Sequence, residues 1–85
     1  MGTACVYHKG VGTTGVEVVK DTTITDAFKC SELCDGNDEC TVWTYTMSTY
    51  PDASHRNHCY LKKDGVVKEN DARTTGLWSG YRCGK

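Results

Sequence analysis

The sequence is poor in several features, and each shortage excludes a class of protein. Charge is nearly balanced, with ten Lys and Arg residues against eleven Asp and Glu, whereas nucleic-acid-binding modules carry a net basic field. No apolar run approaches the roughly 20 residues that a transmembrane helix needs. We therefore expect that the protein neither binds nucleic acid nor inserts into a membrane.

Motifs of catalysis are also missing, since the chain contains neither G-x-S-x-G nor H-E-x-x-H. The three histidines, His8, His55 and His58, have no acidic residue or nucleophile at a diagnostic spacing. Residues 10–15 do spell G-x-G-x-x-G, but a dinucleotide-binding turn leads into a helix, and β-branched residues follow here. We expect no enzyme activity and no cofactor, and we interpret residues 10–15 as a glycine-rich hairpin connection.

A secretion signal is absent too, because Met1-Gly2-Thr3 leads almost directly to Cys5. The length of 85 residues corresponds to one domain. We expect this single domain, residues 1–85, to be a piece of a longer secreted protein, with Met1 an added start codon.

Cysteine is what the chain has in abundance. An even number in so short a chain predicts a disulfide framework, although spacing alone leaves fifteen pairings open. Disulfides persist in oxidising compartments, so an extracellular location is expected. They also compensate for the small core that a chain of this size can bury. The six are Cys5, Cys30, Cys34, Cys40, Cys59 and Cys83.

A metal site would be another use for these residues. The spacing Cys30-x3-Cys34 fits a pair of zinc ligands, but no second pair follows at a matching spacing. Residues 35–39 are densely acidic, yet a calcium-binding loop needs Gly at its sixth position and an acidic residue at its twelfth. Those positions hold Cys40 and Thr46. We interpret residues 35–39 as a solvated turn and expect no bound metal.

Local patterns predict one helix and several strands. Residues 26–34 contain no Gly or Pro, Thr25 precedes them as a candidate N-cap, and Gly36 marks their C-terminal end. Alternation with period two predicts strands over residues 40–47 and 58–63. Further strands are expected at 4–8, 16–19 and 77–83, an exposed loop at 48–57, and a hairpin turn at Asp64-Gly65.

A locally basic stretch with an aromatic residue inside it follows the exposed loop. Lys and His side chains donate hydrogen bonds to sugar hydroxyls, and an aromatic ring offers an apolar platform, so the stretch predicts a carbohydrate or sulfated-glycan site. The alternative is a hydrophilic loop leading into a strand edge, where Lys deters pairing. Trp43, Tyr45 and Trp78 are instead interpreted as core residues. The candidate site residues are Arg56, His58, Tyr60, Lys62 and Lys63.

Taken in order, these features resemble the PAN/Apple domain family. The resemblance runs from Cys5 to Cys83 and includes the helix with its Cys-x3-Cys spacing. It also includes the segments TVWTY (41–45), CYLK (59–62) and SGYRC (79–83). Within the family, the chain looks most like the apple domains strung in tandem in micronemal adhesins of apicomplexan parasites.

The resemblance implies a small disulfide-rich α+β fold, in which a curved antiparallel sheet of about five strands cradles one α-helix. It implies a domain core over residues 5–83 and the disulfides Cys5–Cys83, Cys30–Cys59 and Cys34–Cys40. Members of the family bind proteins or carbohydrates, and some parasite members are galactose-binding lectins. Residues 48–57 form a segment in which apple domains differ, so specificity is expected there.

We therefore expect a non-catalytic adhesion module of a secreted, micronemal-type protein, located outside the cell in micronemes or on the parasite surface. Its partner would be a host-cell receptor, a glycan or a partner adhesin, with neighbouring apple domains in the parent chain. Two alternatives are a structural spacer without a ligand and a heparin-type binder of sulfated glycans. The second would use Arg56, Lys62, Lys63 and the histidines.

Overall fold

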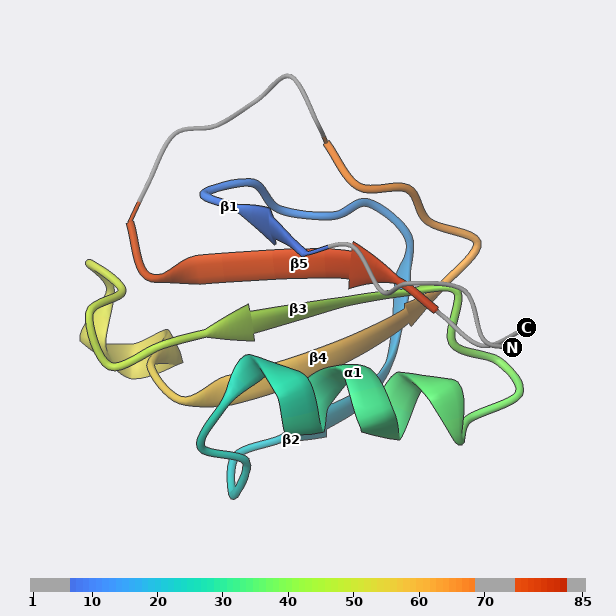
Figure 1. Cartoon of the computed structure of the whole chain (residues 1–85), viewed down its shortest axis with the longest axis horizontal. Coiled ribbons are helices and arrows are strands. Elements are labelled where there is room, and N and C mark those ends of the chain that lie inside the picture. Colours follow the sequence, from blue (N-terminus) through green and yellow to red (C-terminus); the bar gives the residue numbers. More distant parts are fainter. Residues whose placement is uncertain (1–6, 69–74, 83–85) are drawn as a thin grey trace.

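The computed structural model describes residues 7–68 and 75–82, and within them one α-helix packs against a five-stranded sheet (Figure 1). This confirms the expected α+β architecture. No helix in these ranges is long and apolar enough to span a bilayer. The elements are β1 (His8–Lys9), β2 (Val16–Asp21), α1 (Ala27–Asp35), β3 (Val42–Thr46), the 3-10 helix η1 (Ala53–His55), β4 (His58–Lys63) and β5 (Leu77–Tyr81).

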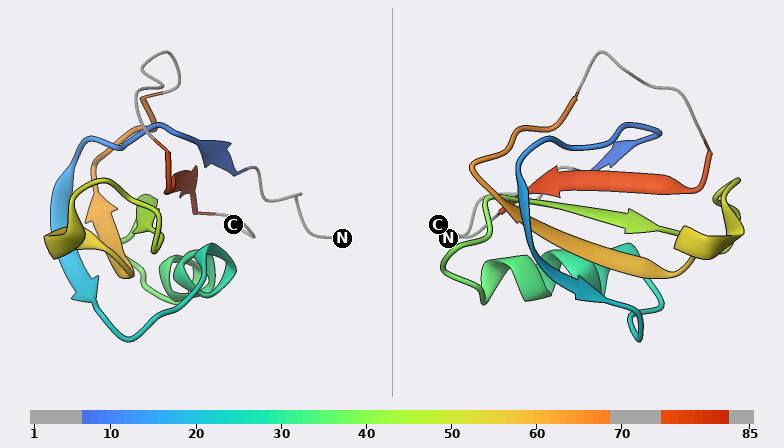
Figure 2. Two further views of the ribbon diagram at one scale, coloured as in Figure 1. Left: turned by 90° about the vertical axis from the view of Figure 1, so that its left-hand side faces the viewer. Right: turned by 180° about the vertical axis from the view of Figure 1, so that it is seen from behind.

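The sheet is antiparallel throughout, with the strand order β1-β5-β3-β4-β2. It curves around α1, which covers one of its faces (Figure 2). Because successive side chains of a strand point to opposite faces, Trp43 and Tyr45 of the central strand β3 pack with the helix. Val42, Thr44 and Thr46 point away from it. All five residues of β3 are nonetheless buried, so the far face is covered as well.

The glycine-rich segment 10–15 provides part of that cover, and its prediction as a hairpin connection is wrong. A hairpin joins neighbouring strands, whereas β1 and β2 lie at opposite edges of the sheet. The segment crosses the face away from α1 (Figure 2), where Val11 and Thr13 are buried. Gly15 permits this path: its φ is +107°, and a Cβ there would lie 2.7 Å from the carbonyl oxygen of Lys63.

The hairpin turn predicted at Asp64-Gly65 is also wrong. Such a hairpin would have placed Lys68 opposite Leu61, but Leu61 already pairs with Trp43 on one side and with Val19 on the other. β4 is therefore an interior strand with no free edge. The chain after it instead joins the crossing segment, where the backbone N–H of Lys68 donates to the carbonyl oxygen of Gly12 at 2.9 Å.

The helix forms where the sequence predicts it, with one correction at its start. The N-cap is Asp26 rather than Thr25, because Asp26 keeps an extended backbone and its Oδ1 accepts a hydrogen bond from the Lys29 N–H at 2.8 Å. Gly36 forms the C-cap, as expected. Cys30 and Cys34, one turn apart, are both fully buried against the sheet.

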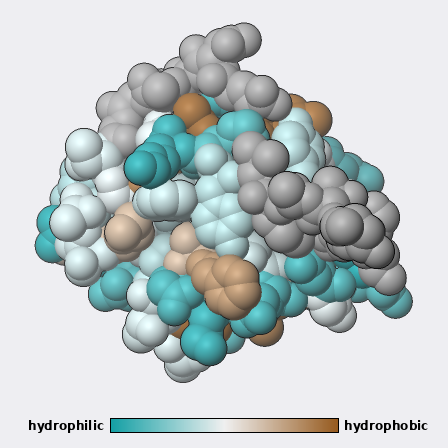
Figure 3. Space-filling model, viewed as in Figure 1, coloured by the Kyte–Doolittle hydropathy of each residue, from teal (hydrophilic) through white to brown (hydrophobic). Residues whose placement is uncertain are grey.

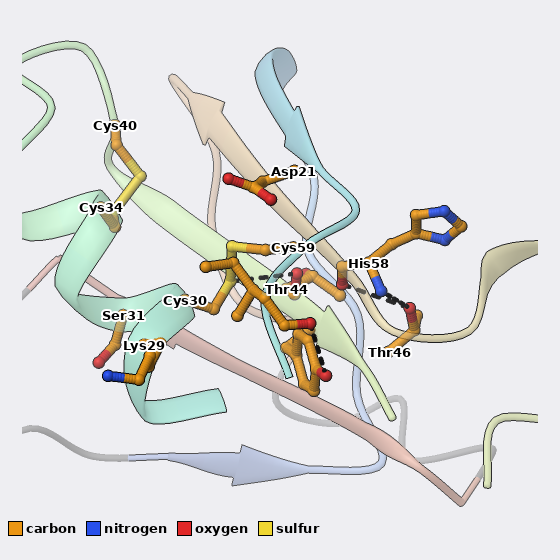
Figure 4. The surroundings of a disulfide bond; sticks show 12 residues. Asp21, Lys29, Cys30, Ser31, Cys34, Cys40, Thr44, Thr46, His58 and Cys59 are labelled. Atoms are coloured by element: carbon orange, nitrogen blue, oxygen red, sulfur yellow. Dashed lines mark hydrogen bonds between the residues drawn. A yellow bond between two sulfur atoms is a disulfide. The ribbon is translucent and has the colours of Figure 1, made fainter. Parts of the chain in front are cut away.

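Two disulfides lie in the core between α1 and the sheet. Cys30–Cys59 joins the helix to β4, and Cys34–Cys40 closes the turn after the helix (Figure 4). Two of the three pairings implied by the family resemblance are thus confirmed. The pair Cys5–Cys83 lies outside the described residues, as do residues 4–6 of the strand expected at 4–8. The core comprises Cys30, Cys34, Cys40, Trp43, Tyr45, Cys59 and Leu61.

The predicted core aromatics differ in burial. Trp43 and Tyr45 are each only 1% exposed, as expected. Trp78 is half-buried at the border of the core, where the Tyr7 ring packs edge-on against it and Lys9 Nζ lies 5.0 Å from its ring centroid. The surface beyond this border is mostly hydrophilic. On the face seen in Figure 3, hydrophobic residues stand apart among polar ones.

Removing the Cys30–Cys59 disulfide should cost more stability than removing Cys34–Cys40. The two bridges span 29 and 6 residues, and the chain-entropy model gives losses of about 3.6 and about 2.4 kcal/mol respectively. Urea unfolding of the two Cys→Ala double variants measures the difference. The comparison is matched because each variant loses two sulfur atoms. A larger loss for the Cys34–Cys40 variant would contradict this ranking.

Candidate functional site

A hollow of about 310 Å³ lies on the face of the sheet away from α1. Strands β2, β3, β4 and β5 contribute to it, the crossing segment 10–15 borders it, and the loop before β4 closes another side. Pockets that hold small ligands begin at about this size. The hollow is lined by Gly12, Thr13, Glu17, Thr44, Thr46, Tyr50, His55, Tyr60, Lys62 and Leu77.

The alternation of β3 and β4 explains which of their side chains reach the hollow. Thr44 of β3 pairs directly with Tyr60 of β4, so both project from the same face of the sheet. Lys62, two residues further along β4, projects from that face as well. The neighbours Cys59 and Leu61 point the other way, into the core with α1. The disulfide and the hollow therefore use opposite sides of the same strand.

A chain of buried hydroxyl groups runs beneath the hollow. Ser79 Oγ lies 2.7 Å from the carbonyl oxygen of Val11, which can only accept, so Ser79 donates there. Thr44 Oγ1, 3.1 Å from Ser79 Oγ, then donates to Ser79. Thr13 Oγ1, 2.7 Å from Thr44 Oγ1, donates to Thr44 in turn. With every hydrogen directed inward, the hydroxyl of Thr13 has only acceptor lone pairs left to offer a ligand.

Lys62 provides the positive charge of the hollow. Its Nζ donates a hydrogen bond to the carbonyl oxygen of Thr13 at 3.0 Å, which ties β4 to the crossing segment. Burial lowers the pKa of Lys62, the charge of Lys68 lowers it further, and Glu17 opposes the shift. Burial and the neighbouring Lys68 thus disfavour the charged form of Lys62, whereas Glu17 favours it.

Tyr60 and His55 form the rim. Tyr60 Oη lies 3.0 Å from His55 Nδ1, and His55 Nε2 lies 3.7 Å from Asp52 Oδ2. Hydrogen bonds from Ser54 lower the pKa of Asp52. Burial, together with the nearby charge of Glu17, raises the pKa of Tyr60. Tyr60 thus keeps its hydroxyl hydrogen at neutral pH and can both donate and accept.

Thr46 fixes the position of this rim. Its Oγ1 donates to the carbonyl oxygen of His55. The same atom accepts a hydrogen bond from the His58 N–H at 3.1 Å, as Figure 4 shows. The N–H of Asn57 donates to the carbonyl oxygen of Thr46 at 2.6 Å. A β3 side chain and backbone therefore hold η1 against the start of β4.

The structure separates the five site residues predicted from the sequence. Tyr60 and Lys62 line the hollow. His58 starts β4 beside them, with its ring centroid 5.8 Å from that of Tyr60, but it does not line the hollow. Arg56 donates to the carbonyl oxygens of Tyr50 and Pro51. Lys63 points to the other face of the sheet, where its Nζ lies 3.9 Å from Glu39 Oε2.

Sequence reasoning missed most of the other lining residues. Thr44 and Thr46 carried a signal, since they are polar residues at alternate positions of an otherwise apolar strand. Thr13 and Glu17 carried none, because their place depends on the path of the crossing segment and on the pairing of β2. Among the described residues, no group of three or more His, Cys, Asp or Glu could hold a metal ion.

The chain matches one family model in a comparison with models of protein families. The model described as "PAN domain" matches residues 13–62, which is more than half of the chain. The matched span contains β2, α1, β3 and all of β4 except its last residue. It also contains both disulfides of the described residues and eight of the residues around the hollow. No curated protein matches the chain closely.

Breaking the hydroxyl chain at its middle should destabilise the fold. Thr44→Val keeps the shape of the side chain but leaves Thr13 and Ser79 without their partner, at a cost of about 2 kcal/mol. The free energy of unfolding of Thr44→Val, Ser79→Ala and the double variant measures this. The two losses should be less than additive because the residues share one network. Strict additivity would contradict the proposed chain.

The pKa of Lys62 should lie below the usual value of about 10.4. Between the lowered pKa of Lys62 in the folded state and its usual pKa in the unfolded state, the unfolded chain binds more protons. Within this pH range, Lys62 therefore makes the free energy of unfolding rise with pH. An NMR titration of the Lys62 side chain measures the pKa directly. Lys68→Gln should raise the pKa of Lys62 and Lys29→Gln, on the outer side of α1, should not. A Lys62 pKa at or above the usual value would contradict the burial of its charge.

Proposed function

This chain belongs to the PAN domain family, and on that premise we propose that it is a carbohydrate-binding module that takes a neutral sugar into the hollow. PAN domains are typically non-catalytic modules that bind proteins or carbohydrates. Disulfides and a PAN domain also characterise extracellular domains. The proposal specifies the kind of ligand and the place where it binds.

The observation that carries the proposal is the combination of groups around one cavity. The ring of Tyr60 offers an apolar surface, the hydroxyl of Thr13 offers acceptor lone pairs, and Lys62 offers a donor. A sugar ring presents an apolar face and a set of hydroxyl groups that both donate and accept, so it can satisfy all three. The volume of about 310 Å³ fits the end of a glycan rather than a long chain.

Two further hypotheses are less well supported. A heparin-type binder needs cationic side chains that converge on one surface, but Lys62 and Lys63 project from opposite faces of β4. Arg56 is engaged with the backbone of its own loop. A spacer without a ligand would not require the cavity, and no contact described above favours it.

The wider role follows from the resemblance of the sequence. We propose that the parent protein is a secreted, micronemal-type adhesin that carries several apple domains, of which this is one. Its ligand would then be a glycan or receptor on a host cell, or a partner adhesin, and tandem copies would increase avidity. We propose no catalysis: all cysteines among the described residues are in disulfides, so none supplies a thiolate.

The matched pair Lys62→Ala and Lys63→Ala tests the site, because the two neighbours point to opposite faces. Binding is first found with a glycan array on the wild-type domain. Lys62→Ala and Tyr60→Ala should each weaken binding at least about tenfold, since each removes a contact group of the hollow. Lys63→Ala should leave it unchanged. Free monosaccharide should compete, and salt should have little effect.

Three outcomes would contradict the proposal. Equal losses for Lys62→Ala and Lys63→Ala, with binding that falls steeply as salt rises, would indicate the heparin-type binder. Wild-type domain that binds no glycan on the array would contradict the sugar site and indicate either a spacer or a protein ligand. Loss of binding in Lys63→Ala alone would place the ligand on the face that α1 covers.

A further inference from the structure

Strand β2 contains an irregularity beside the hollow. In its pairing with β4, Val19 lies opposite Leu61 and Glu17 lies opposite Lys62. Two steps along β2 therefore match one step along β4, so Val18 is an extra residue that forms a β-bulge. Bulges change the direction of side chains and are frequent next to functional sites.

The bulge decides which way Glu17 points. In a regular strand, Val18 would lie opposite Lys62, and Glu17 would face the same side as Val19, toward α1. In the structure, Val18 and Val19 both pack against the core with α1, and Glu17 instead joins the lining of the hollow. The extra residue thus places a carboxylate beside Lys62 and Tyr60.

The carboxylate of Glu17 acts on both of these neighbours. It contributes to the raised pKa of Tyr60 and opposes the lowering of the pKa of Lys62. Glu17 and Lys62 thus bring one negative and one positive charge to the hollow. The positive one already donates to Thr13, whereas the negative one is exposed, and a carboxylate has two oxygens that can accept hydrogen bonds from a ligand.

We propose that Glu17 determines the charge class of the ligand: it accepts hydrogen bonds from sugar hydroxyls and excludes sulfated or carboxylated glycans. A hydroxyl can donate to a carboxylate, whereas a sulfate cannot donate and meets a like charge. This inference rests on the proposed function, because it assigns specificity to the same hollow. It adds a residue on β2 to those predicted from β4.

Two substitutions separate the two effects of Glu17. Glu17→Gln removes the charge and keeps the shape, so it should admit anions. Glu17→Asp keeps the charge but withdraws it by one methylene, so it should still exclude anions. Both should weaken binding of a neutral glycan, by about tenfold for the loss of a charged hydrogen bond. Glu32→Gln, on the exposed side of α1, makes the same change of net charge away from the hollow.

The first measurement needs no sugar. Sodium sulfate is titrated at low ionic strength into each protein, and NMR shifts are followed at the amides of Thr13 and Lys62. Glu17→Gln should show saturable shifts there, whereas wild type, Glu17→Asp and Glu32→Gln should not. Equal responses of wild type and Glu17→Gln would overturn the inference, and they would do so whether or not any glycan binds.

The second measurement uses paired glycans that differ only in sulfation. The ratio of neutral to sulfated binding should fall at least about tenfold in Glu17→Gln relative to wild type, and it should not change in Glu32→Gln. An unchanged ratio in Glu17→Gln would overturn the assignment of Glu17 even if the wild-type domain binds a neutral sugar. The proposed function would then stand with another basis for its specificity.

Discussion

The disulfide between Cys30 and Cys59 holds the helix on one face of the sheet, and the rest of the structure depends on that constraint. It attaches α1 to the interior strand β4 at a fully buried position. The helix side therefore holds the main core side chains of these strands, namely Trp43, Tyr45, Cys59 and Leu61. Their polar neighbours at alternate positions are left to face the other way, where a binding surface can form without disturbing the core.

The other face is shaped by two stretches of chain without regular structure. The segment 10–15 crosses it from one edge strand to the other, and residues 64–68 pair with that segment instead of folding back on β4. Val11, Val42 and Val67 form a small second core where the two meet β3. The hollow is the part of this face that they leave uncovered. Its walls are therefore held in place by the same contacts that stabilise the crossing.

Local sequence patterns predicted much of the fold because they depend on neighbouring residues. The alternation around Trp43 and Tyr45 and the uninterrupted run before Gly36 were sufficient for β3, β4 and α1. The predictions failed where distant segments decide the outcome. Residues 10–15 and Asp64-Gly65 both look like hairpin turns locally, but Leu61 already has partners on both sides. Tyr60 and Lys62 were among the residues predicted because they lie in a stretch with a clear local pattern. Thr13 and Glu17 were missed because their place in the hollow depends on distant segments.

The two outer strands of the sheet have a consequence for a protein that carries many such domains close together. Unpaired strand edges invite pairing between chains, and natural proteins suppress this with very short or bulged edge strands. Within the described residues, β1 has two residues in its ladder, and β2 is interrupted at Val18. Neither edge offers a long, regular row of backbone groups with which a strand of another chain or domain could pair. In the tandem array proposed above, edges of this kind would limit strand pairing between neighbouring domains.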